Sequence, residues 1–433
     1  MRVNIESMGI KVVLKKNSQS KNNVISNSLW NDIYVDDRCE SFLDKSIAVL
    51  LAFVLLFGHF KGIFGLPLSS VVILAISPVL TLLLIRKKLR VTIPCVLFIL
   101  FMLYKTLMHN INVTEALYSA VNIIYIFAAM NGMINLRAFM KTVFAVSVVT
   151  TAVLILQTVT HYLFGIHINF IPVGLLTDEI RVQLGKSIET GLSVRGGFYR
   201  PAGFFDEPSH FTQFVAPLMI YLMFSPSKNQ EKYKAALLIS LGVLLTTSGM
   251  GIALVAACWG GYFVLETVKN NPQRFLKGLA GIAALAIIGL ILFYKVETIR
   301  ELILRIFGLS SRTSYSAIGG RTDMGRLMVS LLSPKERFFG TGAIPNDGDI
   351  YYTGMYRIIL SYGLVGFILY ELVHVTAFLQ MKNEFKWFAL YAGVMLLIGN
   401  TYSFQYRIFY FVFMFCGTYV LSQRSIQKNM IKQ

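Results

Sequence analysis

The chain has 433 residues, of which 55% are hydrophobic and only 14% are charged, and its mean hydropathy is +0.62. A soluble protein averages about 25% charged residues, so this composition excludes a soluble globular enzyme and predicts one integral membrane bundle. The net charge of +18 would suit nucleic-acid binding, but no such motif accompanies it. More than half of the 40 Lys and Arg residues fall in loops predicted on one side of the membrane, so no nucleic-acid partner is expected.

The chain begins with a polar, basic segment, 1–42, without an apolar run of the signal-peptide type, which predicts a cytoplasmic tail. A transmembrane bundle is predicted over 43–421, because a helix needs about 20 apolar residues to cross a bilayer. A second cytoplasmic tail is predicted over 422–433. The twelve predicted spans are roughly 43–60, 63–85, 91–108, 115–134, 138–164, 206–224, 235–247, 249–266, 278–294, 354–379, 387–403 and 405–421.

Loop charge predicts the orientation of these spans, because basic residues concentrate in the cytoplasmic loops of membrane proteins. The clearest such loop is Arg86-Lys87-Lys88-Leu89-Arg90. Alternate loops after it are also basic, provided that the chain turns at Thr246-Thr247-Ser248-Gly249. If one long helix ran through these residues instead, the predicted orientation of every later span would be reversed. An all-α polytopic protein with about twelve transmembrane helices and both termini in the cytoplasm satisfies the whole pattern.

Two long outer loops remain, at about 165–205 and about 295–353, and loops of this length usually carry function. Both are rich in arginine, whose planar guanidinium binds phosphate in bidentate fashion, whereas lysine acts as a point charge. Any single arginine could pair with a nearby carboxylate or a lipid headgroup. The cationic excess of the whole set indicates an anionic ligand at the outer face, such as a diphosphate-linked lipid.

The end of the first loop, Arg200 to His210, brings a cation, two carboxylates and an imidazole to the start of a predicted helix. Pro208 suits the first turn of that helix. Asp206 and Glu207 then lie at its N-terminus, where negative charge is stabilised, so plain capping explains them as well as chemistry does. Alternatively, Glu207 or His210 accepts a proton from a sugar hydroxyl, as a general base does. A lone histidine at a helix start is more often structural than catalytic.

Other chemistry is not indicated by the sequence. The four cysteines form no CxxC pair, and no HExxH or other metal-ligand spacing is present. We therefore expect no disulfide, no metal and no cofactor. No chemistry is assigned to the remaining histidines, which are His59, His109, His161, His167 and His374.

Two segments resemble a known family. Arg200-Pro-Ala-Gly-Phe-Phe-Asp-Glu-Pro-Ser resembles the R-x-S-G-x-F-x-E-P pattern of Wzy-type polysaccharide repeat-unit polymerases, which share a membrane superfamily with the O-antigen ligases. Gly320-Arg321, Phe339-Gly340-Thr-Gly342 and Ser361-Tyr-Gly363-Leu-Val-Gly366 resemble the superfamily's S-G-R, F-G-x-G and G-L-x-G elements. The resemblance extends over residues 43–421 only in the general arrangement of spans and loops, and it is specific only in these two segments.

The resemblance implies a metal-independent membrane glycosyltransferase with a GT-C-like bundle, acting at the outer face of a bacterial plasma (inner) membrane. Its donor and acceptor would be oligosaccharide repeat units linked to undecaprenyl diphosphate, and its product an O-antigen, capsular or exopolysaccharide. An acceptor hydroxyl would attack the anomeric carbon of the donor, and the lipid diphosphate would leave. A chain-length regulator and a flippase are partners expected from the resemblance alone, beside the membrane lipids.

The motifs carry roles over to particular residues. Arg200 and Arg321 are the implied diphosphate contacts, and Glu207 matches the acidic residue of the first motif. Arg195, Arg326 and Arg357 are placed near the substrate by charge and neighbourhood. Catalytic roles are expected for Glu207, His210 and Arg200, with Glu207 ahead of His210 as general base.

Two alternatives stay open. The ligases carry a histidine shortly after the F-G-x-G element, and the corresponding stretch 349–357 has none, which favours a polymerase over an O-antigen ligase. A lipid-linked oligosaccharide flippase or transporter is the alternative of another class. Such a protein should show inverted repeats and charges near the middle of the membrane.

Overall fold

The computed structural model describes residues 30, 41–63, 65–85, 89–108, 113–178, 199–225, 230–270, 319–342, 352–399 and 402–432, and isolated helical positions between 287 and 304. Within these ranges every element is a helix, and β structure is limited to two isolated bridges. The α-helices are α2 (Phe42–Ala52), α3 (Leu68–Ile85), α4 (Ile93–Met108), α5 (Val113–Met130), α6 (Leu136–Phe164), α8 (Pro208–Phe224), α9 (Gln230–Leu245), α10 (Gly249–Asn270), α13 (Gly319–Leu331), α14 (Pro334–Phe339), α15 (Gly354–Gln380), α16 (Asn383–Ile398) and α17 (Phe404–Lys432). Two short 3₁₀ helices, η3 (Leu56–His59) and η4 (Val173–Leu175), follow α2 and α6.

The described helices have the character of a membrane-embedded protein. Four of them, α3, α5, α6 and α15, are long and apolar enough to cross a membrane, and α4 and the Gly249–Leu265 part of α10 are shorter apolar helices. Large apolar side chains such as Leu82 and Leu163 are exposed on their surfaces, as expected where lipid is the solvent. The predicted span at 278–294 falls mostly outside the described residues. The segment 422–433, predicted as a tail, continues α17 to Lys432.

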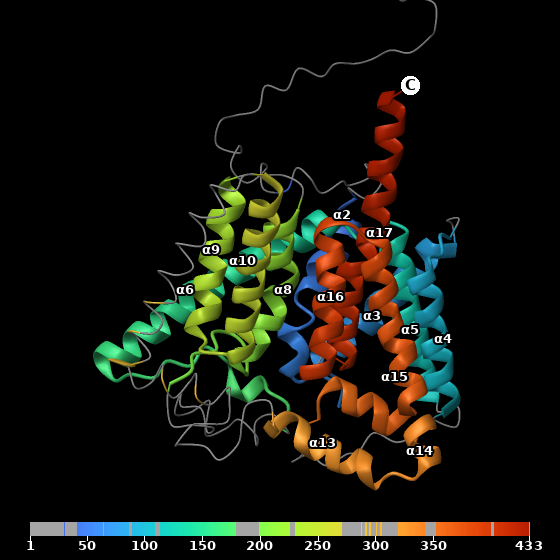
Figure 1. Cartoon of the computed structure of the whole chain (residues 1–433), viewed down its shortest axis with the longest axis horizontal. Helices are drawn as coiled ribbons and strands as arrows, with labels where there is room; N and C mark the ends of the chain where they lie inside the picture. The colour runs from blue at the N-terminus through green and yellow to red at the C-terminus, as the bar shows by residue number, and fades with distance from the viewer. Residues whose placement is uncertain are drawn as a thin grey trace, which may run out of the picture.

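A turn separates α9 from α10, as the loop charges require. Thr247 takes a positive φ of 51°, and the two helices then lie side by side (Figure 1). They are joined by a hydrogen bond from Trp259 Nε1 to Ser240 Oγ of 2.9 Å and by one between the hydroxyls of Tyr262 and Tyr233 of 2.8 Å. The chain therefore reverses at Thr246–Ser248, and the prediction of a turn there is confirmed.

The core is built around α8 and the first half of α17. Every residue of α8 from Ser209 to Met223 except His210 is buried, and a helix that is apolar all round is an interior helix. Aromatic side chains of α17, among them Phe409 and Phe413, pack against α8 and α16. The Tyr410 hydroxyl donates to the Gln213 carbonyl at 3.1 Å. The start of α8 is thus held rigidly by the bundle.

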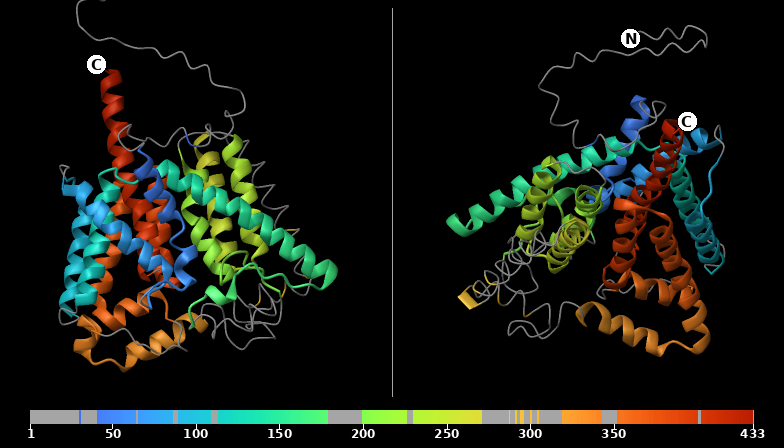
Figure 2. Two further views of the ribbon diagram at one scale, coloured as in Figure 1. Left: turned by 180° about the vertical axis from the view of Figure 1, so that it is seen from behind. Right: turned by 45° about the horizontal axis from the view of Figure 1, so that its top comes forward.

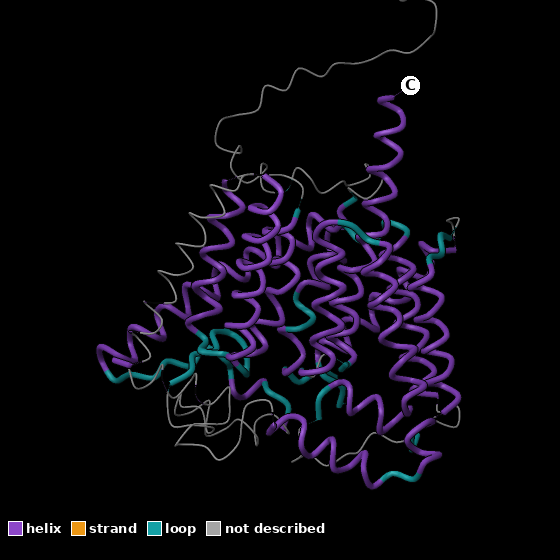
Figure 3. The backbone as a smooth tube through the Cα atoms, viewed as in Figure 1, coloured by secondary structure: helices purple, strands orange, loops and turns teal. Residues whose placement is uncertain are grey.

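One end of the bundle is covered by helices that lie across it. In Figures 1 and 2, α13 and α14 run across the end where α6 finishes and α8 begins, whereas the C-terminal part of α17 projects from the opposite end. We call the covered end the α13 end. The tube drawing in Figure 3 shows the same change of direction between the upright helices and those crossing the end.

A kink at Gly363 turns α15 along the α13 end. Its φ of 68° and ψ of −174° interrupt the helix, so the first turns of α15 run beside α13 (Figure 1). Tyr356 and Leu360 pack there on Met328 and Val329 of α13. The buried contact between these short apolar faces fixes α13 against the bundle.

The glycines of the second motif permit a direct backbone contact between the α14 end and this kink. The amides of Thr341 and Gly342 donate to the carbonyls of Leu360 and Ser361 at 2.8 and 3.0 Å. A Cβ on Gly340 would lie 2.2 Å from the Ser361 carbonyl oxygen. One on Gly363 would lie 2.1 Å from the Phe338 carbonyl oxygen. Only glycine fits either position, so the F-G-x-G and G-L-x-G elements form one structural unit.

Candidate functional site

Three side chains from two distant parts of the chain meet at the α13 end. Asp206 Oδ1 lies 2.9 Å from His59 Nε2 and 2.5 Å from His210 Nδ1. The two imidazoles are nearly parallel, at an interplanar angle of 10° with centroids 5.1 Å apart. We call His59, Asp206 and His210 the His–Asp–His cluster. His210 was a predicted site residue, whereas His59 was not, and no local signal in the sequence connects it to Asp206.

The backbone holds each member of the cluster in place. Pro208 is the first residue of α8, and the His210 amide makes the first helical hydrogen bond, to the Glu207 carbonyl at 2.9 Å. His59 ends η3, and its carbonyl accepts from the Thr177 amide at 3.0 Å. The segment after α6 thus pairs with the segment after α2. That pairing carries His59 to the start of α8.

The sequence left open whether Asp206 caps the N-terminus of α8, and the structure shows that its side chain does not. Its side chain is only 7% exposed and accepts hydrogen bonds from the two imidazoles. Burial by itself raises the pKa of this carboxyl, but the charges and hydrogen bonds of His210 and His59 outweigh it and lower the pKa below its ordinary value. Glu207 is the N-cap residue of α8 but makes no capping hydrogen bond with its side chain.

The cluster fits proton sharing better than metal binding. Its ligand atoms lie within 4.8 Å of one another, which by distance alone would admit a metal. However, ligands around a tetrahedral zinc ion are about 3.3 Å apart, and the separations of 2.5 and 2.9 Å are hydrogen-bond lengths. The carboxylate oxygen itself occupies the point at which both nitrogens converge, so an ion would have to displace it.

The geometry orients His210 as a proton acceptor. Because the Asp206 carboxylate can only accept, His210 must donate through Nδ1, and its basic nitrogen in the neutral ring is then Nε2. Nε2 lies 3.9 Å from Glu207 Oε2. The His210 and Glu207 side chains are 21% and 40% exposed, so both can be reached from outside. A carboxylate that fixes the tautomer of an imidazole is the arrangement of general-base catalysis.

Arg200 precedes the cluster on a segment pinned to α6. Gly203, at φ 65°, donates its amide to Gln157 Oε1 at 3.0 Å, and a Cβ there would lie 2.6 Å from Thr150. Tyr199 stacks on His161 with centroids 4.0 Å apart. Arg200 itself is half-buried, with its Nε covered. The Arg200–Asp206 segment therefore lies against the end of α6 and leads directly into the cluster.

The other predicted arginines belong to the layer that crosses the α13 end, as far as the structure describes them. Arg326 is exposed on α13, and Arg357 is half-buried in the first turns of α15. The two helices meet where Gly325 packs so closely on Tyr356 that a Cβ would lie 2.3 Å from its ring. Arg321 lies on α13, but its side chain is outside the described residues, as is the whole of Arg195.

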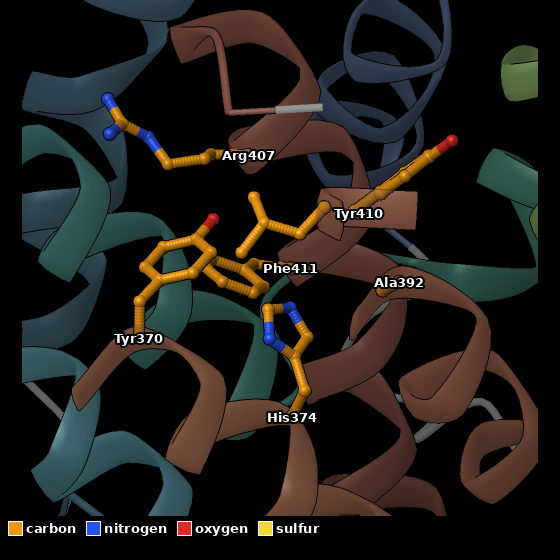
Figure 4. A pocket seen from close by; sticks show the side chains of 7 residues that line it. Tyr370, His374, Ala392, Arg407, Tyr410 and Phe411 are labelled. Carbon is orange, nitrogen blue, oxygen red and sulfur yellow. The ribbon is translucent and has the colours of Figure 1, made fainter. Parts of the chain in front are cut away.

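A second group of polar side chains is buried around the start of α17. Arg407 is 5% exposed, and its guanidinium lies over the Tyr402 ring at 4.6 Å. The preceding residue, Tyr406, is 5.9 Å from the His210 ring between centroids. Figure 4 shows that Arg407 extends from α17 on one side of a small cavity, with His374 on another. The cavity is lined by Tyr370, His374, Ala392, Leu396, Arg407, Tyr410 and Phe411.

No family model matches the sequence, and no curated protein is significantly similar to it.

Proposed function

We propose that this chain is a membrane glycosyltransferase that polymerises oligosaccharide repeat units linked to undecaprenyl diphosphate. The observation that carries the proposal is the convergence at one end of the bundle. The Arg200–His210 segment and the layer formed by α13 and the first turns of α15 both lie there (Figure 1). These are the two segments that resemble the polymerase motifs. A positioned base and several guanidinium groups at one membrane face are what transfer from a lipid diphosphate requires.

The proposal includes a GT-C-like bundle of about twelve spans in a bacterial plasma membrane, with both termini in the cytoplasm. Helices occur at most of the predicted spans. The span predicted at 43–60 holds only the 11-residue α2 and the short η3, and 278–294 is largely outside the described residues. α17 projects from the bundle at the end opposite α13 (Figure 1), so a cytoplasmic C-terminus would put the α13 end outside.

The proposed reaction uses the residues of this chain for proton transfer and charge neutralisation. A hydroxyl of the acceptor sugar attacks the anomeric carbon of the donor while its proton passes to His210 Nε2. Asp206 stabilises the imidazolium that forms, and Glu207 lies next to the protonated nitrogen. The bond from the anomeric carbon to the diphosphate oxygen breaks. Arg200, Arg321, Arg326 and Arg357 neutralise the negative charge that develops on the departing lipid diphosphate.

The distribution of buried charge argues against a transporter. Lys105 pairs with Glu115, and Arg407 lies near the start of α17. These residues lie within a turn or so of helix ends, where loops begin. The exception is His374, whose Nδ1 is 3.6 Å from Glu371 within α15. The His374–Glu371 pair is therefore the one observation that favours a flippase among the described residues. An O-antigen ligase would use the same chemistry with another acceptor.

Loss of the gene, and separately Arg200→Ala and Arg321→Ala, should leave surface glycan as single repeat units on the acceptor. Lysine at either position should fail too, because it cannot bind two phosphate oxygens with a planar fork. Gel electrophoresis of surface glycan measures this, with Lys335→Ala on the same face as the control. Bare acceptor would identify a ligase instead. Normal long polymer in both arginine variants would remove these residues from the mechanism.

A further inference from the structure

The helix α13 presents three distinct faces around its axis. One face, with Met328 and Val329, packs on the first turns of α15 together with Leu332, which directly follows the helix. A second face carries Met324, Leu327 and Leu331, at helical spacing, which are 40%, 52% and 72% exposed. The third face is polar and includes Arg326, Asp323 and Ser330, all exposed. The apolar residues at 324, 327 and 331 are thus uncovered beside a polar strip.

Several local hydrogen bonds close the corner between α13 and α14. Arg337 donates from Nε to the Leu332 carbonyl at 3.0 Å and from Nη2 to the Ser330 carbonyl at 2.6 Å, at the C-terminus of α13. Ser333 and Glu336 form a reciprocal capping box at the start of α14. These bonds satisfy polar groups at the end of α13 and the start of α14. After this corner, α14 exposes Phe338 and Phe339.

The segment also has the orientation and charge of an interfacial helix pair. Both helices run across the end of the bundle, in a different direction from the upright helices (Figure 1). Basic residues exceed acidic ones in Gly319–Phe339, because Arg321, Arg326, Lys335 and Arg337 stand against Asp323 and Glu336. An amphipathic helix of this kind lies in the plane of a membrane surface, with its cations near anionic lipid phosphates.

We infer that α13 and α14 are embedded in the phospholipid headgroup layer at this face of the membrane. Leu327 and Leu331 reach the start of the acyl chains, and Arg326 stays at the level of the phosphates. The occupant of the exposed apolar face is the surrounding lipid. This placement puts Arg321 and Arg326 at the depth of a lipid-linked diphosphate, instead of in the aqueous phase. Their relevance to such a substrate rests on the proposed function.

The inference is tested by fluorescence quenching in vesicles. A variant with Cys39, Cys95, Cys258 and Cys416 replaced by serine or alanine receives one new cysteine, Leu331→Cys or, as the matched control on the polar face, Ser330→Cys. The full-length protein is labelled with a polarity-sensitive dye. It is then reconstituted into vesicles of phosphatidylethanolamine and phosphatidylglycerol that contain lipids with a nitroxide at a shallow acyl position.

The dye at position 331 should emit at shorter wavelength than the dye at 330 and be quenched several-fold more strongly by the nitroxide lipid. Aqueous iodide should quench the two dyes in the opposite order. Leu327→Cys should repeat the behaviour of Leu331→Cys, which guards against a local disturbance at one position. Gel filtration in detergent checks that each variant folds like its cysteine-free parent.

Two results would overturn the inference. Strong iodide quenching at 331 and 327 without nitroxide quenching would place the segment in water. Protection from both quenchers that disappears on dilution of the protein in the vesicles would show that a second copy covers this face. The readout needs no glycan substrate, so an inactive protein with the expected quenching would refute only the proposed enzyme activity.

Discussion

Asp206 is a carboxylate almost completely removed from solvent, and its partners are two imidazoles. A buried charge is stable only if it is paired and hydrogen-bonded. His59 therefore has a role that does not require contact with substrate, because it holds Asp206 ionised and oriented. Asp206 in turn determines which nitrogen of His210 is basic. In the proposed reaction His59 and Asp206 would be positioning residues, and His210 and Glu207 the candidates for contact with a reacting hydroxyl.

The general base can be identified from matched substitutions. His210→Asn should lower the turnover of polymerisation by about 10²–10⁴-fold, the usual contribution of a general base. Glu207→Gln should lower it less, because Glu207 lies beside Nε2 and does not orient the ring. The rate is measured with purified protein and lipid-linked repeat units, with His161→Asn at the end of α6 as the control. A larger loss in Glu207→Gln than in His210→Asn would assign the base to Glu207.

The lowered pKa of Asp206 also predicts how stability depends on pH. A carboxyl whose pKa is depressed by folding stabilises the native state above its unfolded pKa of about 4, and loses that effect as pH falls through the folded pKa. The difference in unfolding free energy between the wild type and Asp206→Asn should therefore not shrink between pH 8 and 5. Thermal unfolding in detergent across this range measures the difference. A steady decrease from pH 7 to 5 would mean that Asp206 already takes up its proton there.

At the level of elements, the α13 end depends on backbone contacts that glycine alone permits. The carbonyl of Tyr362, at the kink, accepts from the Tyr104 hydroxyl of α4 at 3.0 Å, and the same hydroxyl lies 3.2 Å from the Phe339 carbonyl. Three elements therefore meet at the kink. The glycines of the F-G-x-G and G-L-x-G elements have a structural role here, because they let α14 join α15, which in turn positions α13.

Gly363→Ala should destabilise this junction strongly. Alanine at φ 68° and ψ −174° costs about 1–3 kcal/mol for the conformation alone, and its Cβ would collide with the Phe338 carbonyl. The melting temperature in detergent should fall, and polymerisation should be lost with it. Gly260→Ala in α10 is the control, because no atom lies within 4 Å of a Cβ there, and it should be neutral or stabilising by up to about 1 kcal/mol. Equal melting temperatures for the two variants would contradict the role of the kink.

At the level of the whole molecule, the two ends of the bundle differ in what they expose. α17 extends beyond the bundle at one end, and α13 and α14 cross the other (Figure 2). Cytoplasmic loops of membrane proteins are enriched in Lys and Arg, and on that basis we propose that the α17 end faces the cytoplasm. In the proposed orientation the His–Asp–His cluster and the proposed diphosphate contacts lie on the outer side.

This orientation is testable by cysteine labelling of the full chain. In a cysteine-free background, Lys335→Cys on α14 should react with a membrane-impermeant maleimide in intact cells with a permeable outer envelope. Lys428→Cys near the C-terminus should react only after the cells are opened. Labelling is read by gel shift. Reaction of Lys428→Cys in intact cells would reverse the orientation and with it the side of the membrane on which the proposed reaction occurs.

The positions of most apolar helices and the turn at Thr246–Ser248 followed from the sequence alone. These are local properties, because the transfer of a segment from water to lipid depends on the sum of its own side chains. The helix α13 escaped prediction within the long loop at 295–353, since a short amphipathic helix has little mean hydropathy.

Only the tertiary structure brought His59 to Asp206 and revealed the buried Arg407 beside Tyr402. It also decided that Asp206 binds imidazoles instead of capping α8. These contacts depend on how the segment after α6 packs on the segment after α2, and on where α17 crosses the bundle. Such packing is a property of the whole chain, because residues far apart in sequence become neighbours only when their helices pack together in the folded bundle.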